Sequence, residues 1–123
     1  MDFRLELVQV PVSDIDRAKA FYVDQVGFVA DHDVTVSEEL RFVQLTPPGS
    51  ACSIVLDLTM TEMPPGSLHG LQVVVDDADA AREHLLARGV DAPAVQDLPW
   101  GRFTGFTDPD GNTWAIQQIV PQG

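Results

Sequence analysis

The sequence predicts an α+β fold in which two tandem βαβββ modules place their sheets side by side around a central cleft. Two observations predict it: an internal repeat, and the same order of strand-like and helix-like patterns in both copies. VSDIDRAKAFYVDQVGF recurs as VDDADAAREHLLARGV, with Asp14 and Asp77 63 residues apart, and RFVQLTPPG recurs as RFTGFTDPDG at an offset of 61. Two copies are too few for a solenoid. We therefore expect one domain over 1–123 whose modules cover about 1–61 and 62–123.

The first module begins with a strand over residues 4–11, where apolar and polar side chains alternate. A helix follows, capped by Ser13 or Asp14 and ended by Gly27, because glycine tolerates the left-handed conformation found after helices. Its apolar residues recur at helical spacing: Ile15, Ala18, Phe21 and Tyr22. Three more strands are expected at 28–35, 40–46 and 52–58.

The second module repeats this order. Its first strand is expected at 69–75, and its helix is capped by Asp76 or Asp77 and ended by Gly89. The apolar stripe of that helix consists of Ala78, Ala81 and Leu85. The last three strands are expected at 90–96, 102–107 and 113–119. The turn DPDG before the final strand is given a structural role, because proline and glycine suit a tight turn that aims a strand.

Composition and charge exclude several classes of protein. No apolar run approaches the ~20 residues of a membrane span, and MDFRLELVQV does not have the pattern of a signal peptide, so we expect a cytoplasmic protein. The single Cys52 excludes an internal disulfide. A formal charge of −12 repels phosphate backbones, so nucleic-acid binding is not expected. The same charge would attract a cationic ligand, although an acidic surface also simply keeps a protein soluble.

The doubled pattern resembles the vicinal oxygen chelate superfamily, which includes glyoxalase I, bleomycin-resistance proteins and extradiol dioxygenases. The resemblance rests on the two helix stretches quoted above and on FTDPDGNTWAIQQI, and it covers nearly the whole chain. It implies that the two modules form an incomplete barrel with a concave cleft. It also implies that in metal enzymes four side chains, His or Gln, Glu, His and Glu, hold a divalent cation. They come from the first and last strands of each module, and the ion polarises substrate oxygens.

At those four positions this sequence has Leu7, Ser53, Gly70 and Ala115. None offers an imidazole or a carboxylate, so no metal cofactor is expected. His69 keeps one alternative open. Strand alternation points it to the face opposite Gly70 unless a bulge intervenes, so a shifted metal site that uses His69 stays possible on the sequence alone.

Strand alternation also predicts which residues line the cleft. One set is consistently apolar and should pack against the helices: Val8, Val10, Cys52, Ile54, Leu56, Leu71, Val73, Trp114 and Ile116. The opposite set should face the cleft: Leu7, Gln9, Ser53, Val55, Asp57, Gly70, Gln72, Ala115 and Gln117. By resemblance, the loop LPWGRF borders the cleft as well. The ligand-binding candidates are therefore Gln9, Gln72, Gln117, Ser53, Trp100 and Arg102.

Each candidate has a structural alternative. The three glutamines can bind one another or water, and Trp100 can fill a hydrophobic gap instead of stacking on a ligand. Arg102 is the repeat partner of Arg41, and both can pair with acidic neighbours instead of a substrate.

Three functions follow in order of preference. The first is a metal-free protein that binds a small molecule, akin to the bleomycin-resistance branch, whose members sequester a drug in clefts formed by a dimer. The second is a metal-dependent lyase, isomerase or dioxygenase with an atypical site near His69 and Gln9. The third is a structural or regulatory protein. A homodimer is expected from the resemblance and because two small modules expose sheet edges.

Overall fold

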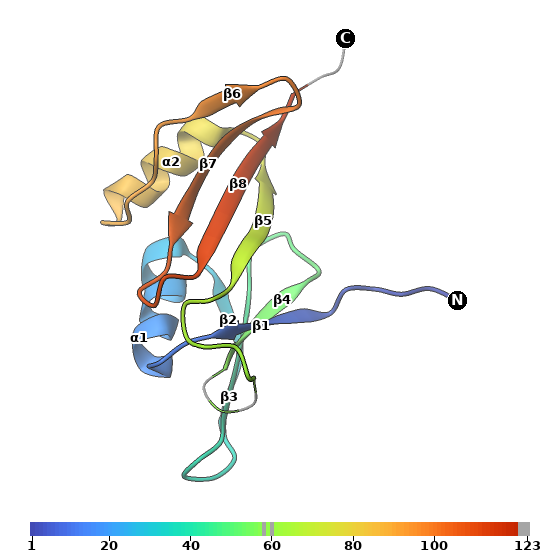
Figure 1. Cartoon of the computed structure of the whole chain (residues 1–123), viewed down its shortest axis with the longest axis vertical. Coiled ribbons are helices and arrows are strands. Elements are labelled where there is room, and N and C mark those ends of the chain that lie inside the picture. The colour runs from blue at the N-terminus through green and yellow to red at the C-terminus, as the bar shows by residue number, and fades with distance from the viewer. Residues whose placement is uncertain (58, 60, 121–123) are drawn as a thin grey trace.

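A computed structural model describes residues 1–57, 59 and 61–120. It contains two four-stranded sheets, each with a helix packed on one face (Figure 1). The first module consists of β1 (Leu7–Pro11), α1 (Ile15–Ala20), the π-helix η1 (Phe21–Val26), β2 (Val29–Thr35), β3 (Arg41–Thr46) and β4 (Ser53–Asp57). The second consists of β5 (His69–Val75), α2 (Ala78–Ala87), β6 (Gln96–Leu98), β7 (Gly101–Thr107) and β8 (Thr113–Ile119).

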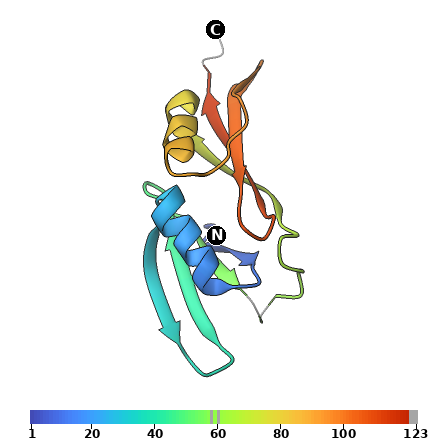
Figure 2. The ribbon, with the colours of Figure 1, turned by 90° about the vertical axis from the view of Figure 1, so that its left-hand side faces the viewer.

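Both sheets have the same topology, which confirms the predicted α+β fold of paired βαβββ modules. The strand orders are β1-β4-β3-β2 and β5-β8-β7-β6, with one parallel pair in each sheet between its first and last strands. The described residues form no closed barrel. Both helices lie on the same side of the molecule, on the left in Figure 1 and towards the viewer in Figure 2. None of the helices in the described part of the chain is long and apolar enough to cross a membrane.

The structure decides between the two capping candidates of each helix. Asp14 accepts a hydrogen bond from the backbone N–H of Arg17 at 3.0 Å, and Asp77 accepts one from Ala80 at 3.1 Å. Aspartate is therefore the cap in both modules. Gly27 follows the first helix with a φ of 105°, as the sequence predicts, because only glycine adopts that conformation freely.

Two predicted strands differ from the observed ones by more than one residue at an end, and residue 58 of the strand expected at 52–58 lies outside the described residues. The strand expected at 90–96 is instead β6 at Gln96–Leu98, and Val90 and Ala92 pack into the core as irregular chain. Pro93 explains the difference, because it has no N–H for a sheet ladder and restricts the residue before it. β1 begins at Leu7 rather than residue 4, since β4 begins at Ser53 and offers residues 4–6 no continuous neighbour.

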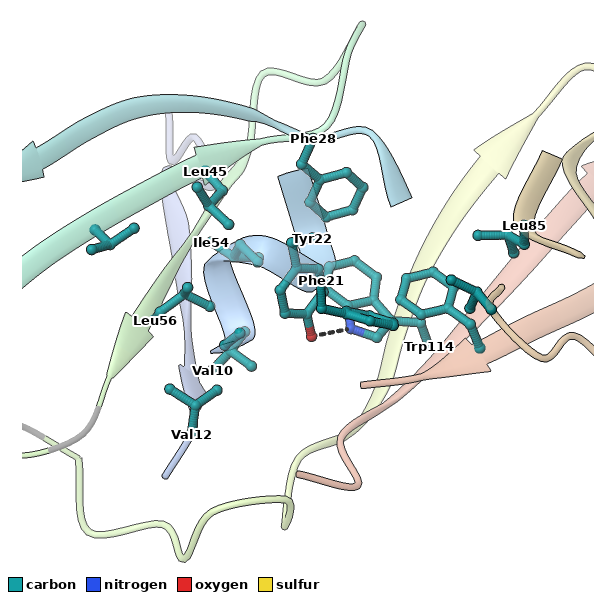
Figure 3. Close-up of a cluster of buried hydrophobic side chains, with 14 of the residues drawn as sticks. Val10, Val12, Phe21, Tyr22, Phe28, Leu45, Ile54, Leu56, Leu85 and Trp114 are labelled. Atoms are coloured by element: carbon teal, nitrogen blue, oxygen red, sulfur yellow. Dashed lines mark hydrogen bonds between the residues drawn. The ribbon is translucent and has the colours of Figure 1, made fainter. Parts of the chain in front are cut away.

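An aromatic cluster joins the two modules in the core (Figure 3). Tyr22 is fully buried, with ring centroids 5.6 Å from Phe28 and 5.8 Å from Trp114. Phe106 stacks on Trp114 at 5.4 Å and lies 6.0 Å from Phe21. Because the rings come from η1, β7, β8 and the chain before β2, their burial fixes one module against the other.

The buried carboxylate of Asp108 in the DPDG turn holds this joint together. One of its oxygens accepts the backbone N–H groups of residues 110–112, each at 2.9 Å. The other accepts the Tyr22 hydroxyl and the Asn112 side-chain amide, each at 2.7 Å. Trp114 Nε1 donates to the Tyr22 oxygen at 3.0 Å. The turn therefore does more than aim β8, because its carboxylate also anchors the first module.

Candidate ligand-binding face

We call the face of each sheet that is turned away from its helix the open face. Val10, Ile54, Leu56, Trp114 and Ile116 lie in the core cluster on the helix side, and Leu71 and Val73 pack against it. This confirms the predicted apolar set, apart from Val8 and Cys52, which are only half-buried. Alternation and register then place the neighbouring residues on the open face: Leu7, Gln9, Gln44, Ser53 and Val55 in the first module, and Gln72, Val74, Phe103, Ala115 and Gln117 in the second.

In the first module, Ser53 is buried on the open face within a cluster of polar side chains. Its hydroxyl accepts the side-chain amide of Gln44 at 3.2 Å and lies 2.7 Å from the Thr46 hydroxyl, which bonds in turn to Asp31. Gln9 is half-buried on β1, in a row with Val55 and Gln44 across three strands. Gln9 and Ser53 therefore lie on one wall, as predicted.

In the second module, two of the predicted glutamines meet. The Gln72 amide donates to the Gln117 side-chain oxygen at 2.7 Å, and the Gln117 amide donates to the Trp100 carbonyl at 3.2 Å. Trp100 lies in the β6–β7 turn with 58% of its surface exposed. These two hydrogen bonds thus fix the position of the turn that carries the exposed indole ring. Hydrogen bonding among glutamines and ligand binding are compatible, since each amide has further donors and acceptors.

Arg102 points to the helix side instead. Its guanidinium donates to Asp97 at 2.7 Å and to Asp79 at 2.9 Å, and both bonds raise its pKa further, Asp79 foremost. Its cross-strand neighbour Gln118 accepts the N–H of Ala78 at the start of α2, which identifies the face. Arg102 thus follows the structural alternative, in which the repeated arginines pair with acidic neighbours.

The register of β5 differs from the one counted along the sequence. Leu7 lies opposite Ser53, but Gln72 rather than Gly70 lies opposite Ala115. The cause is a register shift between His69 and Leu71, where Gly70 has a φ of 99°. This bulge brings His69 next to Thr113 on the open side, with Nδ1 2.8 Å from the Thr113 hydroxyl oxygen. The bulge that the sequence analysis left open is therefore present, and it places His69 on the open side rather than on the helix side.

The side chains at the four expected metal-ligand positions, with Gln72 in place of Gly70, do not fit the divalent cation of the related metal enzymes. Leucine, serine and alanine supply neither imidazole nor carboxylate, and the amide of Gln72 is a weak substitute. Within residues 1–57, 59 and 61–120, no group of three or more His, Cys, Asp or Glu side chains is placed to hold a metal ion. The metal-free state stays a prediction, and we derive no step through a bound ion.

Sequence reasoning missed three aromatic groups on the open face. Phe42 and Phe103 are repeat partners that follow the repeated arginines, and their registers opposite Val34 and Gln117 place them on this face. His32 lies on the same face, with its ring centroid 6.5 Å from that of Phe42. The signal was available, because residues next to helix-facing arginines must face the other way.

A largely apolar hollow of about 490 Å³ lies between β5, α2 and the turn at residues 47–50. Ala81, His84 and Leu85 of α2 line it together with the core residues Phe106 and Ile116, so it lies mainly on the helix side. Of the open-face residues named above, Gln72 and Val74 alone belong to its lining.

Comparisons with known proteins agree with this geometry. Residues 4–116 match the model of the Glyoxalase/Bleomycin resistance protein/Dioxygenase superfamily. TnmS3, an antibiotic binding protein from Streptomyces sp. CB03234, is 41% identical with a TM-score of 0.89, over 97% of this chain and 98% of that one. A glyoxalase/bleomycin resistance protein from the same organism is 43% identical with a TM-score of 0.84, over 94% and 100%. YetH, an uncharacterised protein of Bacillus subtilis (strain 168), is 27% identical over 115 residues, which are 90% of this chain and 94% of YetH.

Proposed function

This chain belongs to the Glyoxalase/Bleomycin resistance protein/Dioxygenase superfamily, and on that premise we propose that it is a metal-free, homodimeric protein that binds an antibiotic on its open face. The similarity to an antibiotic binding protein extends over 97% of the chain at 41% identity, which supports a small antibiotic as the ligand. The cytoplasmic location expected from the sequence remains part of the proposal.

The observation that carries this proposal is the chemistry of the second module's open face. Phe103 offers a flat apolar surface on this face, Trp100 offers a second one in the adjoining β6–β7 turn, and Gln72 and Gln117 offer amides that donate and accept hydrogen bonds. Such a wall suits a planar molecule with polar groups along its edges, which stacks on the rings while the amides fix its orientation.

The first module supplies the negative charge that a cationic ligand needs. Asp31 bonds to Thr46 next to Ser53 and therefore lies beside the polar group of the open face. A ligand with an aromatic body and a cationic arm can bind both walls, with its charge on the first module. The net charge of −12 favours the approach of such a molecule.

Ligand binding is tested by tryptophan fluorescence. The chain has two tryptophans, and Trp114 is buried, so quenching by a bound ligand reports on Trp100. We expect saturable quenching and a raised melting temperature with bleomycin, a cationic glycopeptide, or with an uncharged polycyclic aromatic antibiotic. Trp100→Phe should abolish the quenching. If neither antibiotic changes the fluorescence or the melting temperature, the proposed ligand class is wrong.

A pair of matched variants locates the site. Gln72→Leu removes one amide of the open face, whereas Gln25→Leu makes the same chemical change on the helix side, where the amide donates to Arg88. Binding should weaken about fivefold or more in the first variant, which corresponds to the cost of ~1–3 kcal/mol for an unmade polar contact, and it should change little in the second. Equal effects would exclude the open face as the site.

The second candidate is a metal-dependent lyase, isomerase or dioxygenase, and the position of His69 on the open side favours it. Elemental analysis of untagged protein that has not met a chelator separates the two functions. The metal-free proposal expects no stoichiometric Ni, Zn, Fe, Mn or Co. A near-equimolar metal that is lost in His69→Ala would establish the second candidate instead.

A further inference from the structure

An irregularity in β2 places two neighbouring carboxylates on opposite faces of the first sheet. A register shift between Ala30 and His32 makes Asp31 an extra residue in the ladder between β2 and β3. The shift lets Asp31 reach the open face, where the Thr46 hydroxyl donates a hydrogen bond to it. Asp33 instead points to the helix side, where it contacts a lysine of α1. The two carboxylates therefore have different surroundings, although they lie two residues apart.

The charges of these two carboxylates are balanced differently. Asp33 accepts hydrogen bonds from the Arg41 guanidinium at 2.8 and 2.9 Å and from Lys19 Nζ at 2.7 Å. In the described part of the chain, no lysine, arginine or histidine forms an ion pair with Asp31. All seven residues of β2 are exposed, so a ligand from solution can reach this strand. Asp31 therefore presents an unbalanced negative charge on the open face.

A row of hydrogen bonds fixes the direction of the Asp31 carboxylate. An ionised carboxylate only accepts hydrogen bonds, so Thr46 is the donor to Asp31 Oδ2. Ser53 Oγ lies 2.7 Å from the Thr46 hydroxyl oxygen and is therefore the donor to it, and the Gln44 amide donates to Ser53 at 3.2 Å. Hydrogen bonds in such a row polarise one another. The row holds one carboxylate oxygen, while the other can accept hydrogen bonds from a ligand.

The second module folds without this row. At offsets of 61 or 62 residues, the equivalents of Asp31, Gln44 and Ser53 are Pro93, Gly105 and Ala115. None of these three side chains can form hydrogen bonds. Because both sheets have the same topology, the fold does not require the row. Ser53 occupies one of the positions that hold a cation in the related metal enzymes, and here it directs a carboxylate instead.

We propose that Asp31, positioned by Thr46 and Ser53, binds the primary ammonium group of a ligand whose aromatic part lies on His32 and Phe42. The two rings lie on the same face with centroids 6.5 Å apart. A primary ammonium donates a charge-assisted hydrogen bond to the second carboxylate oxygen, whereas a quaternary ammonium has the charge but no N–H. The ligand class is therefore an arylalkyl amine. An antibiotic as the occupant rests on the proposed function, whereas binding of the amine does not.

NMR titration with three small probes tests the site. Phenethylammonium, its N,N,N-trimethyl derivative and phenethyl alcohol share a ring and differ in charge and in N–H groups. The backbone amide resonances of Asp31, His32 and Thr46 should shift, and the Kd of phenethylammonium should be at least about fivefold below those of the other two. Equal dissociation constants, or no shift at these residues up to about 20 mM phenethylammonium, overturn the proposal.

Two matched variants locate the charge that binds the ammonium. Asp31→Asn and Asp33→Asn each remove one negative charge from β2, but on opposite faces. The preference for phenethylammonium over phenethyl alcohol should disappear in Asp31→Asn and stay within about twofold of the wild type in Asp33→Asn. Both residues are on an exposed strand, so circular dichroism should show an intact fold. An equal loss of preference in both variants reduces the effect to overall charge and overturns the proposal.

Replacement of Thr46 tests the positioning role. Thr46→Val removes the hydroxyl that holds Asp31 and keeps the shape of the side chain. The preference for the ammonium should fall at least about threefold while binding of phenethyl alcohol stays unchanged, and Thr46→Ser should restore the preference. A merely structural role would weaken binding of all three probes alike, and that result refutes positioning by Thr46.

Daunorubicin and N-acetyl daunorubicin separate this proposal from the proposed function. Both are planar polycyclic compounds, but only the first has a primary ammonium, and fluorescence anisotropy measures the binding of each. At least about fivefold weaker binding of daunorubicin alone in Asp31→Asn supports both proposals. Binding of both compounds without dependence on Asp31 refutes the ammonium site and leaves the proposed function standing. Binding of phenethylammonium through Asp31 without binding of any antibiotic refutes the proposed ligand class and establishes the ammonium site.

Discussion

Replacement of Tyr22 by phenylalanine removes one oxygen from the joint between the modules and should destabilise the whole domain. The hydroxyl donates to the Asp108 carboxylate at 2.7 Å and accepts the Trp114 indole N–H at 3.0 Å. All three residues are buried, so water cannot take its place. The phenyl ring keeps the aromatic contacts, and the perturbation is confined to these two hydrogen bonds.

The expected loss follows from the two partners. A hydrogen bond to a charged group contributes about 1.5–3 kcal/mol, and an indole N–H left without an acceptor costs about 1–3 kcal/mol. Because Asp108 keeps its other donors, we expect the free energy of unfolding to fall by roughly 2–4 kcal/mol in total. The unfolding entropy of 123 residues is about 0.26 kcal/mol/K, so the melting temperature should fall by roughly 8–16 °C.

Urea denaturation followed by circular dichroism measures this change. Thr104→Val is the control, because it removes one buried hydroxyl that donates to the neutral carbonyl of Pro93 at 2.8 Å. That variant should lose only about 1 kcal/mol. A loss below 1 kcal/mol in Tyr22→Phe at unchanged m-value, or a loss no greater than in the control, would refute the view that this hydroxyl bonds the modules together.

Three further predictions concern the same region. Gly105→Ala should lower the free energy of unfolding by ~2 kcal/mol or more in urea, because the added Cβ would lie 2.3 Å from the Trp114 carbonyl oxygen on the neighbouring strand. Gly101→Ala should cost less than Gly105→Ala, since its closest contact is the movable Gln117 amide at 2.6 Å and the backbone oxygen of Gln118 is 3.1 Å away, but antibiotic binding should weaken as that amide shifts. Burial, and then the neighbouring carboxylate, raise the pKa of Tyr22, so the free energy of unfolding should fall above pH ~10, where the unfolded chain loses a proton that the folded chain keeps. Tyr22→Phe should lack that component of the pH profile.

The order of elements could be predicted because the patterns that indicate each strand, helix and helix end occur in both copies of the repeat. The caps Asp14 and Asp77 and the terminal Gly27 are local signals, and each depends only on the few residues around it. The strand predicted at 90–96 differs from β6, because the prediction followed the strand-like pattern of these residues and did not allow for the N–H that Pro93 lacks.

The candidate site was predicted as far as strand alternation remains regular. Gln72 and Gln117 meet as neighbours on the open face because alternation holds along β8 and most of β5. The bulge at Gly70 reverses the face of His69, and counting along a strand cannot detect an extra residue. The position of Arg102 depends on which aspartates the hairpin and α2 bring near it, which are contacts between elements rather than properties of one stretch.

The shared direction of the two helices gathers charges of both signs on one side of the molecule. Asp14, Asp24, Asp77 and Glu83 are exposed on or beside the helices, and so are Arg17 and Arg88. Neighbouring charges of opposite sign weaken one another's field, so at long range a charged molecule meets mainly the net charge of −12. At 0.15 M salt the screening length is about 8 Å, and most of this long-range attraction or repulsion disappears. The rate at which a cationic molecule associates should therefore fall as the salt concentration rises.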